Sequence, residues 1–149
     1  MAAFQNLLPV LAEALGLDDL PTEEDGRVLF GLDDSLGGVM EEVDAEEAGA
    51  EGMVASILIG MPDRNDAALL CEILAGNYMW AASGEGTLAL DRESGMLVVH
   101  RFFAADTPGD DFLDIFASMV SAARYWRSFL EGTSASSGEA SSYPGMLSV

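Results

Sequence analysis

The sequence contains no lysine. Six arginines and one histidine stand against 26 aspartates and glutamates, which gives a formal net charge of −20. Binding of nucleic acid needs cations that displace the counterions condensed on phosphates, and a strongly anionic surface is repelled by anionic membranes as well. We therefore expect a protein that does not bind nucleic acid.

Cysteine is nearly absent too. Cys71 is the one cysteine, so a disulfide within the chain is excluded, which fits a reducing compartment. It lies in a helical pattern among apolar neighbours, and we expect it to pack among them. The N-terminal stretch lacks the positively charged start of a signal peptide, and no apolar run is long enough to span a membrane. We expect a cytoplasmic protein without membrane insertion.

Motifs that carry chemistry are also missing. His100 lies in a strand pattern, and no motif supplies it with a nucleophile or a carboxylate partner. The acidic run 41–51 lacks the carboxylate spacing of a calcium loop, and the glycines in 84–86 precede a strand where a phosphate cradle needs a helix. We predict no catalytic residue, no metal and no cofactor, so function must lie in the surfaces of the protein.

Hydrophobic residues make up 50% of the 149 residues, which is enough to form the core of one ordinary domain. The first apolar stripe predicts an N-terminal helix that ends at Gly16. Pro9 interrupts this helix, because proline lacks the N–H that an interior position donates. Either the helix begins at Asn6, with Pro9 in its first turn, or it bends at Pro9.

The central stretch 66–103 organises the rest of the chain. Asp66 is placed to cap a helix whose apolar residues recur every three or four positions, and Gly76 and Asn77 are expected to end it. Strands are predicted at 87–91 and 96–103, joined by a four-residue turn that ends in glycine. This stretch therefore predicts a helix followed by a β-hairpin.

Further strands are predicted on both sides of the central helix, at 27–32, 37–44, 53–60 and 78–83. The nearly continuous apolar run 53–60 indicates burial on both faces, or burial on one face and a partner on the other. An acidic loop is expected at 45–52. The last helix should begin with Asp110 or Asp111 as its cap and end at Gly132.

This order of elements predicts an α+β fold. An antiparallel β-sheet of about five to six strands, joined mostly by tight turns, would be flanked by three helices in the order helix, three strands, helix, two to three strands, helix. Residues 1–131 would form a single domain, and residues 132–149 a flexible tail rich in serine and glycine.

The central helix has too few charges for a helix with one solvated face, since Asp66 and Glu72 are its only ones. We therefore expect a second chain to cover it in a homodimer, and aromatic residues after the helix suit such an interface. The predicted dimer residues are Leu69, Leu70, Ile73, Leu74, Tyr78 and Trp80. A second apolar set could form a groove, with packing in the core as the alternative: Phe4, Leu7, Leu8, Leu11, Val28 and Phe30.

The run LLCEILAGNYMW, followed by GEGTLALDRESGMLVVHRFF and a last helix with Phe112, Phe116 and Trp126, resembles the type III secretion chaperones of the CesT/SycE kind, the Tir chaperone family. The resemblance extends from about Phe4 to Leu130, and the loop 37–52 and the tail match it poorly. It implies a homodimer in the cytoplasm of a Gram-negative bacterium. Such a chaperone binds the N-terminal segment of a secreted effector, keeps it secretion-competent without nucleotide hydrolysis, and delivers it to the secretion apparatus.

The resemblance also implies roles for the two apolar sets. The central-helix set would face the twofold axis of the dimer, and the set from Phe4 to Phe30 would face the client. Two other classes of protein remain open. A regulatory or ligand-sensing α+β module would bind a small molecule in a pocket, and an acidic mimic of nucleic acid would bind a basic partner. An enzyme ranks last, because no acid/base pair is marked.

Overall fold

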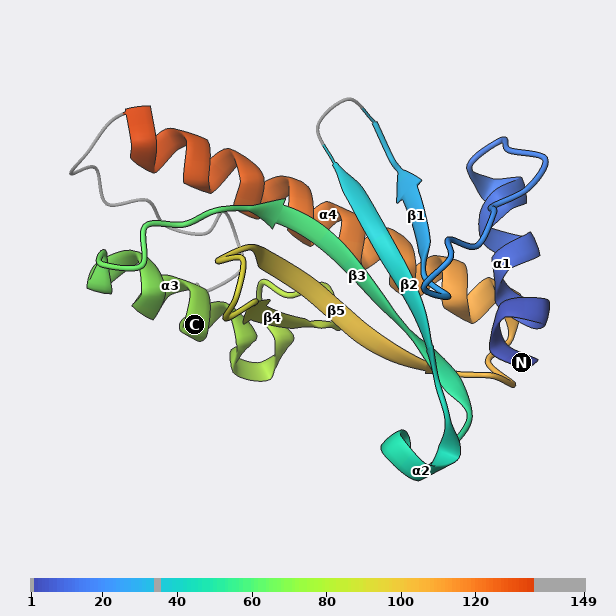
Figure 1. Cartoon of the computed structure of the whole chain (residues 1–149). Helices are drawn as coiled ribbons and strands as arrows, with labels where there is room; N and C mark the ends of the chain where they lie inside the picture. The colour runs from blue at the N-terminus through green and yellow to red at the C-terminus, as the bar shows by residue number, and fades with distance from the viewer. Residues whose placement is uncertain (1, 34–35, 136–149) are drawn as a thin grey trace.

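The computed structural model describes residues 2–33 and 36–135 (Figure 1). In chain order its elements are α1 (Ala2–Ala14), β1 (Val28–Gly31), β2 (Gly37–Val43), α2 (Ala45–Ala48), β3 (Gly52–Gly60), α3 (Ala67–Asn77), the 3₁₀ turn η1 (Tyr78–Trp80), β4 (Thr87–Leu90), β5 (Leu97–Ala104) and α4 (Gly109–Ala135). The five strands of the described residues form one antiparallel sheet in the order β1-β2-β3-β5-β4. The predicted α+β fold is confirmed.

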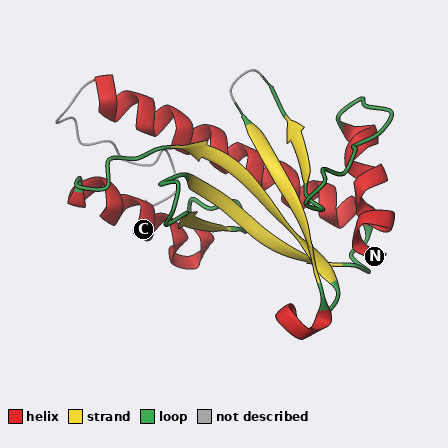
Figure 2. Ribbon diagram, in the orientation of Figure 1, coloured by secondary structure: helices red, strands yellow, loops and turns green. Residues whose placement is uncertain are grey.

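The helices lie against one face of the sheet and at its two ends (Figure 2). Helix α4 packs on β3 and β5, α1 packs on α4 and β3, and α3 packs on β4. Strand β3 alternates between buried and half-buried residues, as expected of a strand with helices on one side only. The core therefore lies between the sheet and α4.

Helix α4 supplies the largest share of this core, through buried residues that recur every three or four positions along its 27 residues. These residues are Phe112, Phe116, Met119, Ala123 and Trp126. Two of them meet aromatic side chains of the sheet. The ring centroids of Phe112 and Phe103 are 4.9 Å apart, and those of Phe116 and Phe30 are 5.8 Å apart. The aromatic contacts fix α4 across the strands.

Helix α1 ends as the sequence predicts. Gly16 has φ +72°, and the amides of Gly16 and Leu17 donate to the carbonyls of Glu13 (3.1 Å) and Ala12 (2.9 Å), which is the paired arrangement of a Schellman motif. Of the two alternatives for its start, the one at Asn6 is wrong, since α1 begins at Ala2 and contains Pro9 in its interior. One hydrogen bond of the helix is lost there.

The predicted hairpin is confirmed. Leu90 of β4 pairs with Leu97 of β5, and the turn between them has Gly95 at φ +79°. The Asp91 carboxylate accepts from the Glu93 amide (3.1 Å) and from the Ser94 hydroxyl (2.8 Å). These bonds hold the pKa of Asp91 below its usual value and close the turn.

The predicted strand at 78–83 is wrong. After α3 the chain forms η1, in which Met79 (φ 53°) and Trp80 (φ 58°) have left-handed conformations that no strand contains. Neither Gly76 nor Asn77 ends α3 by a left-handed turn. A side chain at Gly76 would collide with Trp126, and the Asn77 amide group bonds both backbone groups of Leu88 in β4 (2.7 and 3.0 Å).

Three smaller predictions also differ from the structure. Helix α4 begins at Gly109, so Asp110 and Asp111 lie inside its first turn and neither is its cap. The acidic stretch expected as a loop contains the short helix α2, and α4 does not end at Gly132 but continues to Ala135. Glycine in a helix costs only about 1 kcal/mol relative to alanine, so it is a weak stop. The remainder of the predicted tail, 136–149, lies outside the described residues.

Candidate polypeptide-binding surfaces

Most of the strongly exposed apolar side chains among the described residues cluster where α3 passes into η1, although Met61 (64%) lies apart from them, directly after β3. Four of them define what we call the α3–η1 surface, with exposed fractions in parentheses: Leu74 (69%), Tyr78 (74%), Met79 (71%) and Trp80 (62%). Large apolar side chains gathered in this way mark interaction sites on folded proteins. Cys71 of α3 is also exposed, so the prediction that it packs among apolar neighbours is wrong.

Local structure explains why this side of the molecule is apolar. The Asp66 side chain accepts from the Leu69 amide (3.0 Å) and caps α3, as predicted. The only charged residue within α3, Glu72, lies close to Tyr125 of α4, whose pKa is raised to about 12 by burial and by this carboxylate. The charge of α3 thus lies beside α4, and the opposite side presents apolar groups.

Two hydrogen bonds at Ala82 hold the turn that carries Met79 and Trp80. The indole N–H of Trp126 donates to the Ala82 carbonyl (2.8 Å), and the Ala82 amide donates to the Gly76 carbonyl (2.8 Å). Two consecutive non-glycine residues at positive φ are strained, at a cost of order 1–3 kcal/mol each, and such strain concentrates at functional sites. The fold therefore stabilises a conformation that exposes Trp80.

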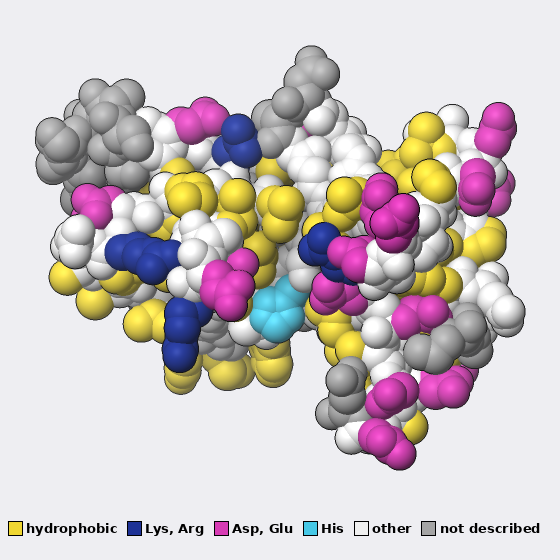
Figure 3. Space-filling model, viewed as in Figure 1, with side chains coloured by type: hydrophobic (Ala, Val, Ile, Leu, Met, Phe, Trp, Pro, Cys, Tyr) yellow, Lys and Arg dark blue, Asp and Glu magenta, His cyan; other side chains and the backbone are white. Residues whose placement is uncertain are grey.

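The second surface is the outer face of the sheet, which faces the viewer in Figure 3. Its cross-strand pairs join β3 to β5 in register: Val54 with Phe102, Ser56 with His100, and Leu58 with Val98. All six side chains are half-buried. Four of them are apolar, so the run 53–60 follows the second predicted alternative, with one face in the core and the other open to a partner.

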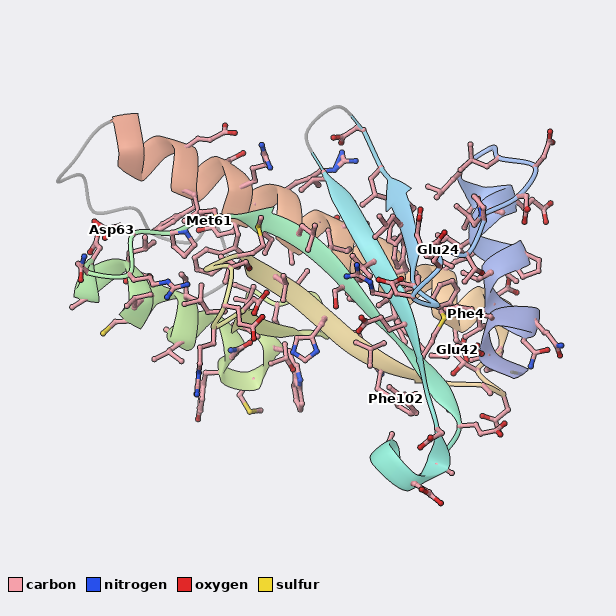
Figure 4. All side chains as sticks on the ribbon, in the orientation of Figure 1. Phe4, Glu24, Glu42, Met61, Asp63 and Phe102 are labelled. Carbon is pink, nitrogen blue, oxygen red and sulfur yellow. The ribbon has the colours of Figure 1, made fainter. Side chains whose placement is uncertain are left out.

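Phe102 lies near the end of β5 (Figure 4), and its ring lies close to Gly52 at the start of β3. A Cβ added at Gly52 would collide with that ring and with the Phe103 carbonyl oxygen. Only glycine fits there, so the absence of a side chain at the start of β3 makes room for the Phe102 ring.

His100 lies opposite Ser56 of β3 and Thr87 of β4. Burial lowers the pKa of its imidazole below the ordinary 6.5, which favours the neutral ring. The position fits the predicted role of an ordinary strand residue.

The pH dependence of stability should report this burial. A group whose pKa is lowered on folding stabilises the native state above its unfolded pKa, and that contribution is lost as the pH falls through the folded pKa. Between about pH 7.5 and 5.5 the parent chain should therefore lose more stability than a His100→Gln variant, measured by urea denaturation. Carboxylates titrate alike in both proteins. An identical loss of stability in the parent chain and in the variant would therefore refute the lowered pKa of His100.

The third surface is a hollow of about 560 Å³ between α1 and the loop that follows it, which we call the α1 hollow. Half-buried Phe4 and buried Leu8 line it from the helix, and Leu17 and Leu20 line it from the loop. The Phe4 amide donates to the Glu42 carboxylate of β2 (3.2 Å), which ties the start of α1 to the sheet, and both residues are labelled in Figure 4.

The residues predicted to face a client are divided by the structure. Phe4 and Leu8 line the α1 hollow. The other four are buried in the core, with exposed fractions of 7% or less: Leu7, Leu11, Val28 and Phe30. Packing in the core, the alternative interpretation of this set, accounts for these four. These four residues present almost no surface to a client. Client contact through them is untested and stays a prediction.

The residues predicted for the dimer are divided as well. Leu69 (5%) and Ile73 (7%) face the core, Leu70 is half-buried, and Leu74, Tyr78 and Trp80 are exposed. The lack of charge pointed to a helix that does present exposed apolar side chains, but the spacing of leucines could not separate its buried side from its exposed side. It missed Met79, because the predicted strand hid the turn that exposes it.

Metal binding and membrane insertion find no support in the part of the chain that the structure describes. Within these residues, no group of three or more histidine, cysteine, aspartate or glutamate side chains is placed to hold a metal ion. None of the helices in the same residues has the length and apolar character needed to cross a bilayer.

An α+β sandwich whose prominent features are exposed apolar surfaces belongs to the class of proteins that bind other polypeptides. The sequence profile of the Tir chaperone protein (CesT) family matches residues 6–127. The chain therefore belongs to the Tir chaperone family, and the resemblance noted in its sequence is confirmed.

Solved structures agree with this fold. The chain is similar to a chain of the ExsC–ExsE complex (18% identity, TM-score 0.66, covering 83% of this chain and 90% of the other) and to one of the HopA1–SchA chaperone–effector complex (18%, 0.65, 84% and 93%). It also matches a structure of the Yersinia pestis type III secretion chaperone SycH with a fragment of YscM2 (23%, 0.61, 82% and 98%). No curated protein sequence matches the chain.

Proposed function

We propose that this protein is a cytoplasmic chaperone that binds the N-terminal segment of a type III secreted effector. It keeps the segment soluble and competent for secretion, without nucleotide hydrolysis, and presents it to the secretion apparatus. The observation that carries the proposal is the exposed apolar surface on a chain that belongs to the Tir chaperone family. Similarity to a chain of the HopA1–SchA chaperone–effector complex supports the same role.

A second copy of the chain covers the α3–η1 surface in this proposal. The surface combines a tyrosine, a tryptophan, a methionine and a leucine, and aromatic residues and methionine are enriched at the centres of interfaces. Because α3 packs on β4, the dimer contact lies toward the β4 edge of the sheet and leaves the β1 edge open.

The client occupies the surfaces that the dimer leaves free. Strand β1 is the outermost strand at its edge, with Leu29 48% exposed, and an extended segment can add to such an edge through backbone hydrogen bonds. The apolar outer face between β3 and β5 can accept side chains of the same segment. The net charge of −20 keeps the loaded complex soluble and favours clients with basic segments.

The proposal predicts one dominant polypeptide bound to the tagged protein purified from the cytoplasm of its own organism, identified by mass spectrometry. Deletion of the N-terminal segment of this client should abolish binding, because the chaperone contacts an unfolded segment and no folded domain. The matched control is a client that lacks an equally long C-terminal segment, which should still bind.

Light scattering of the purified complex should give one client for each chaperone dimer. Binding that survives loss of the N-terminal segment, or a purified protein that carries only a small molecule, would contradict the proposed function.

A further inference from the structure

Acidic residues of this chain gather toward one end of the molecule. In Figure 3 carboxylate side chains are concentrated over the end that holds α1, its following loop and α2, whereas arginines lie mainly toward the opposite end. The one arginine in residues 2–33, Arg27, donates from its Nε to the Asp25 carboxylate at 2.7 Å. The charge of that arginine is thus already paired, and the acidic end keeps its negative field.

The α1 hollow opens within this field. Its buried part is apolar, with Leu8 and Leu20 at 9% and 6% exposure. Three exposed carboxylates also line it, Glu13 from α1 and Asp18 and Asp19 from the loop, and none of the lining residues is basic. An apolar side chain can fill such a hollow while a neighbouring cation meets the carboxylates.

The interior proline of α1 removes one helical donor in the part of the helix that lines the hollow. Pro9 has no N–H, so the carbonyl of Gln5 cannot receive the helical hydrogen bond that residue 9 would donate. Gln5 and Pro9 both line the α1 hollow. A backbone carbonyl without its helical donor can accept from the amide or the guanidinium group of a bound segment.

We propose that the α1 hollow binds an apolar side chain that lies next to arginine or lysine in the client segment. The inference rests on the proposed function and specifies the chemistry of the segment: apolar burial supplies contact area, and the carboxylates select for adjacent positive charge. A segment with acidic neighbours is rejected, because its charges meet Glu13, Asp18 and Asp19.

Three short capped peptides test the proposal against the full-length ¹⁵N-labelled protein. The first carries a leucine between two arginines in a serine–glycine background, the second replaces the arginines with glutamates, and the third replaces the leucine with serine. The first peptide should shift the amide signals of residues 4–22 and bind at least about tenfold more tightly than the other two. Added salt should weaken its binding.

Variants of the loop separate local recognition from the general field of the protein. Asp18→Asn with Asp19→Asn should weaken binding of the arginine peptide about three- to tenfold, as expected for two exposed charge pairs. Glu23→Gln with Glu24→Gln removes the same charge from the same loop outside the lining of the hollow, and should have a smaller effect. All four residues are exposed, so folding should be preserved.

The proposal is overturned if the arginine and glutamate peptides bind equally, if the two double variants behave alike, or if the shifted signals lie on the α3–η1 surface or the sheet. These outcomes leave the proposed function standing, because it is tested separately by capture of the native client. Failure of client capture together with peptide binding in the α1 hollow would instead refute the chaperone role and leave a basic-peptide site.

Discussion

A Leu74→Glu, Trp80→Glu double variant is expected to be monomeric at concentrations at which the parent chain is a dimer. Both side chains are more than 60% exposed in the single chain. In the dimer they would be desolvated, and buried glutamates without partners are costly. Each apolar anchor contributes about 2 kcal/mol at an interface, so the pair should weaken dimerisation by about 1,000-fold.

Light scattering over a range of concentrations measures this effect, with circular dichroism as the check on folding. Leu29→Glu is the matched control, since Leu29 is exposed but lies on β1, at the opposite edge of the sheet from β4. A double variant that remains a dimer would place the dimer contact elsewhere. A Leu29→Glu monomer would do the same.

Trp126→Ala should destabilise the protein by about 3–5 kcal/mol, the usual cost of removing a large buried aromatic side chain. Trp126 is fully buried, lies against Gly76, and donates the hydrogen bond that satisfies the Ala82 carbonyl. This loss is a large part of the roughly 5–15 kcal/mol that stabilises a typical domain. Urea denaturation at one fixed protein concentration measures it, because dimerisation would make stability depend on concentration.

The other tryptophan supplies the control. Trp80→Ala removes the same kind of side chain from an exposed turn, so the stability of the single chain should change by less than about 1 kcal/mol. Measuring both changes in a Leu74→Glu background, at a concentration at which light scattering gives a monomer, removes the contribution of association. Equal destabilisation by the two substitutions would show that the turn around Trp80 is not exposed in solution.

The fold was predictable to the extent that local signals were strong. Asp66 and Gly95 mark a cap and a turn through chemistry within three or four residues, and both appear where expected. The stretch 78–83 failed because its conformation depends on distant groups. Its aromatic residues favour a strand, but Trp126, 44 positions away, and β4 hold the chain in a compact turn.

The candidate surfaces were predictable in kind and less so in detail. The low charge of the central helix predicts that a partner covers it, yet only the packing of α3 on β4 shows that Ile73 faces inward and Leu74 outward. Leu7 and Leu11 could not be assigned to core or surface from the sequence. An apolar stripe along a helix has the same spacing whether it packs in the core or lines a groove. The α1 hollow could not be predicted, because it depends on the path of the loop 17–22, and no periodic pattern in the sequence determines that path.

The exposed thiol of Cys71 makes the proposed assembly accessible to site-specific spectroscopy. It is the only thiol in the chain and projects from α3, the helix that carries Leu74. A single maleimide-linked fluorophore or spin label can therefore be attached without mutagenesis. Its reaction rate and its emission would follow the covering of α3 in real time, as subunits exchange or as a client is loaded and released.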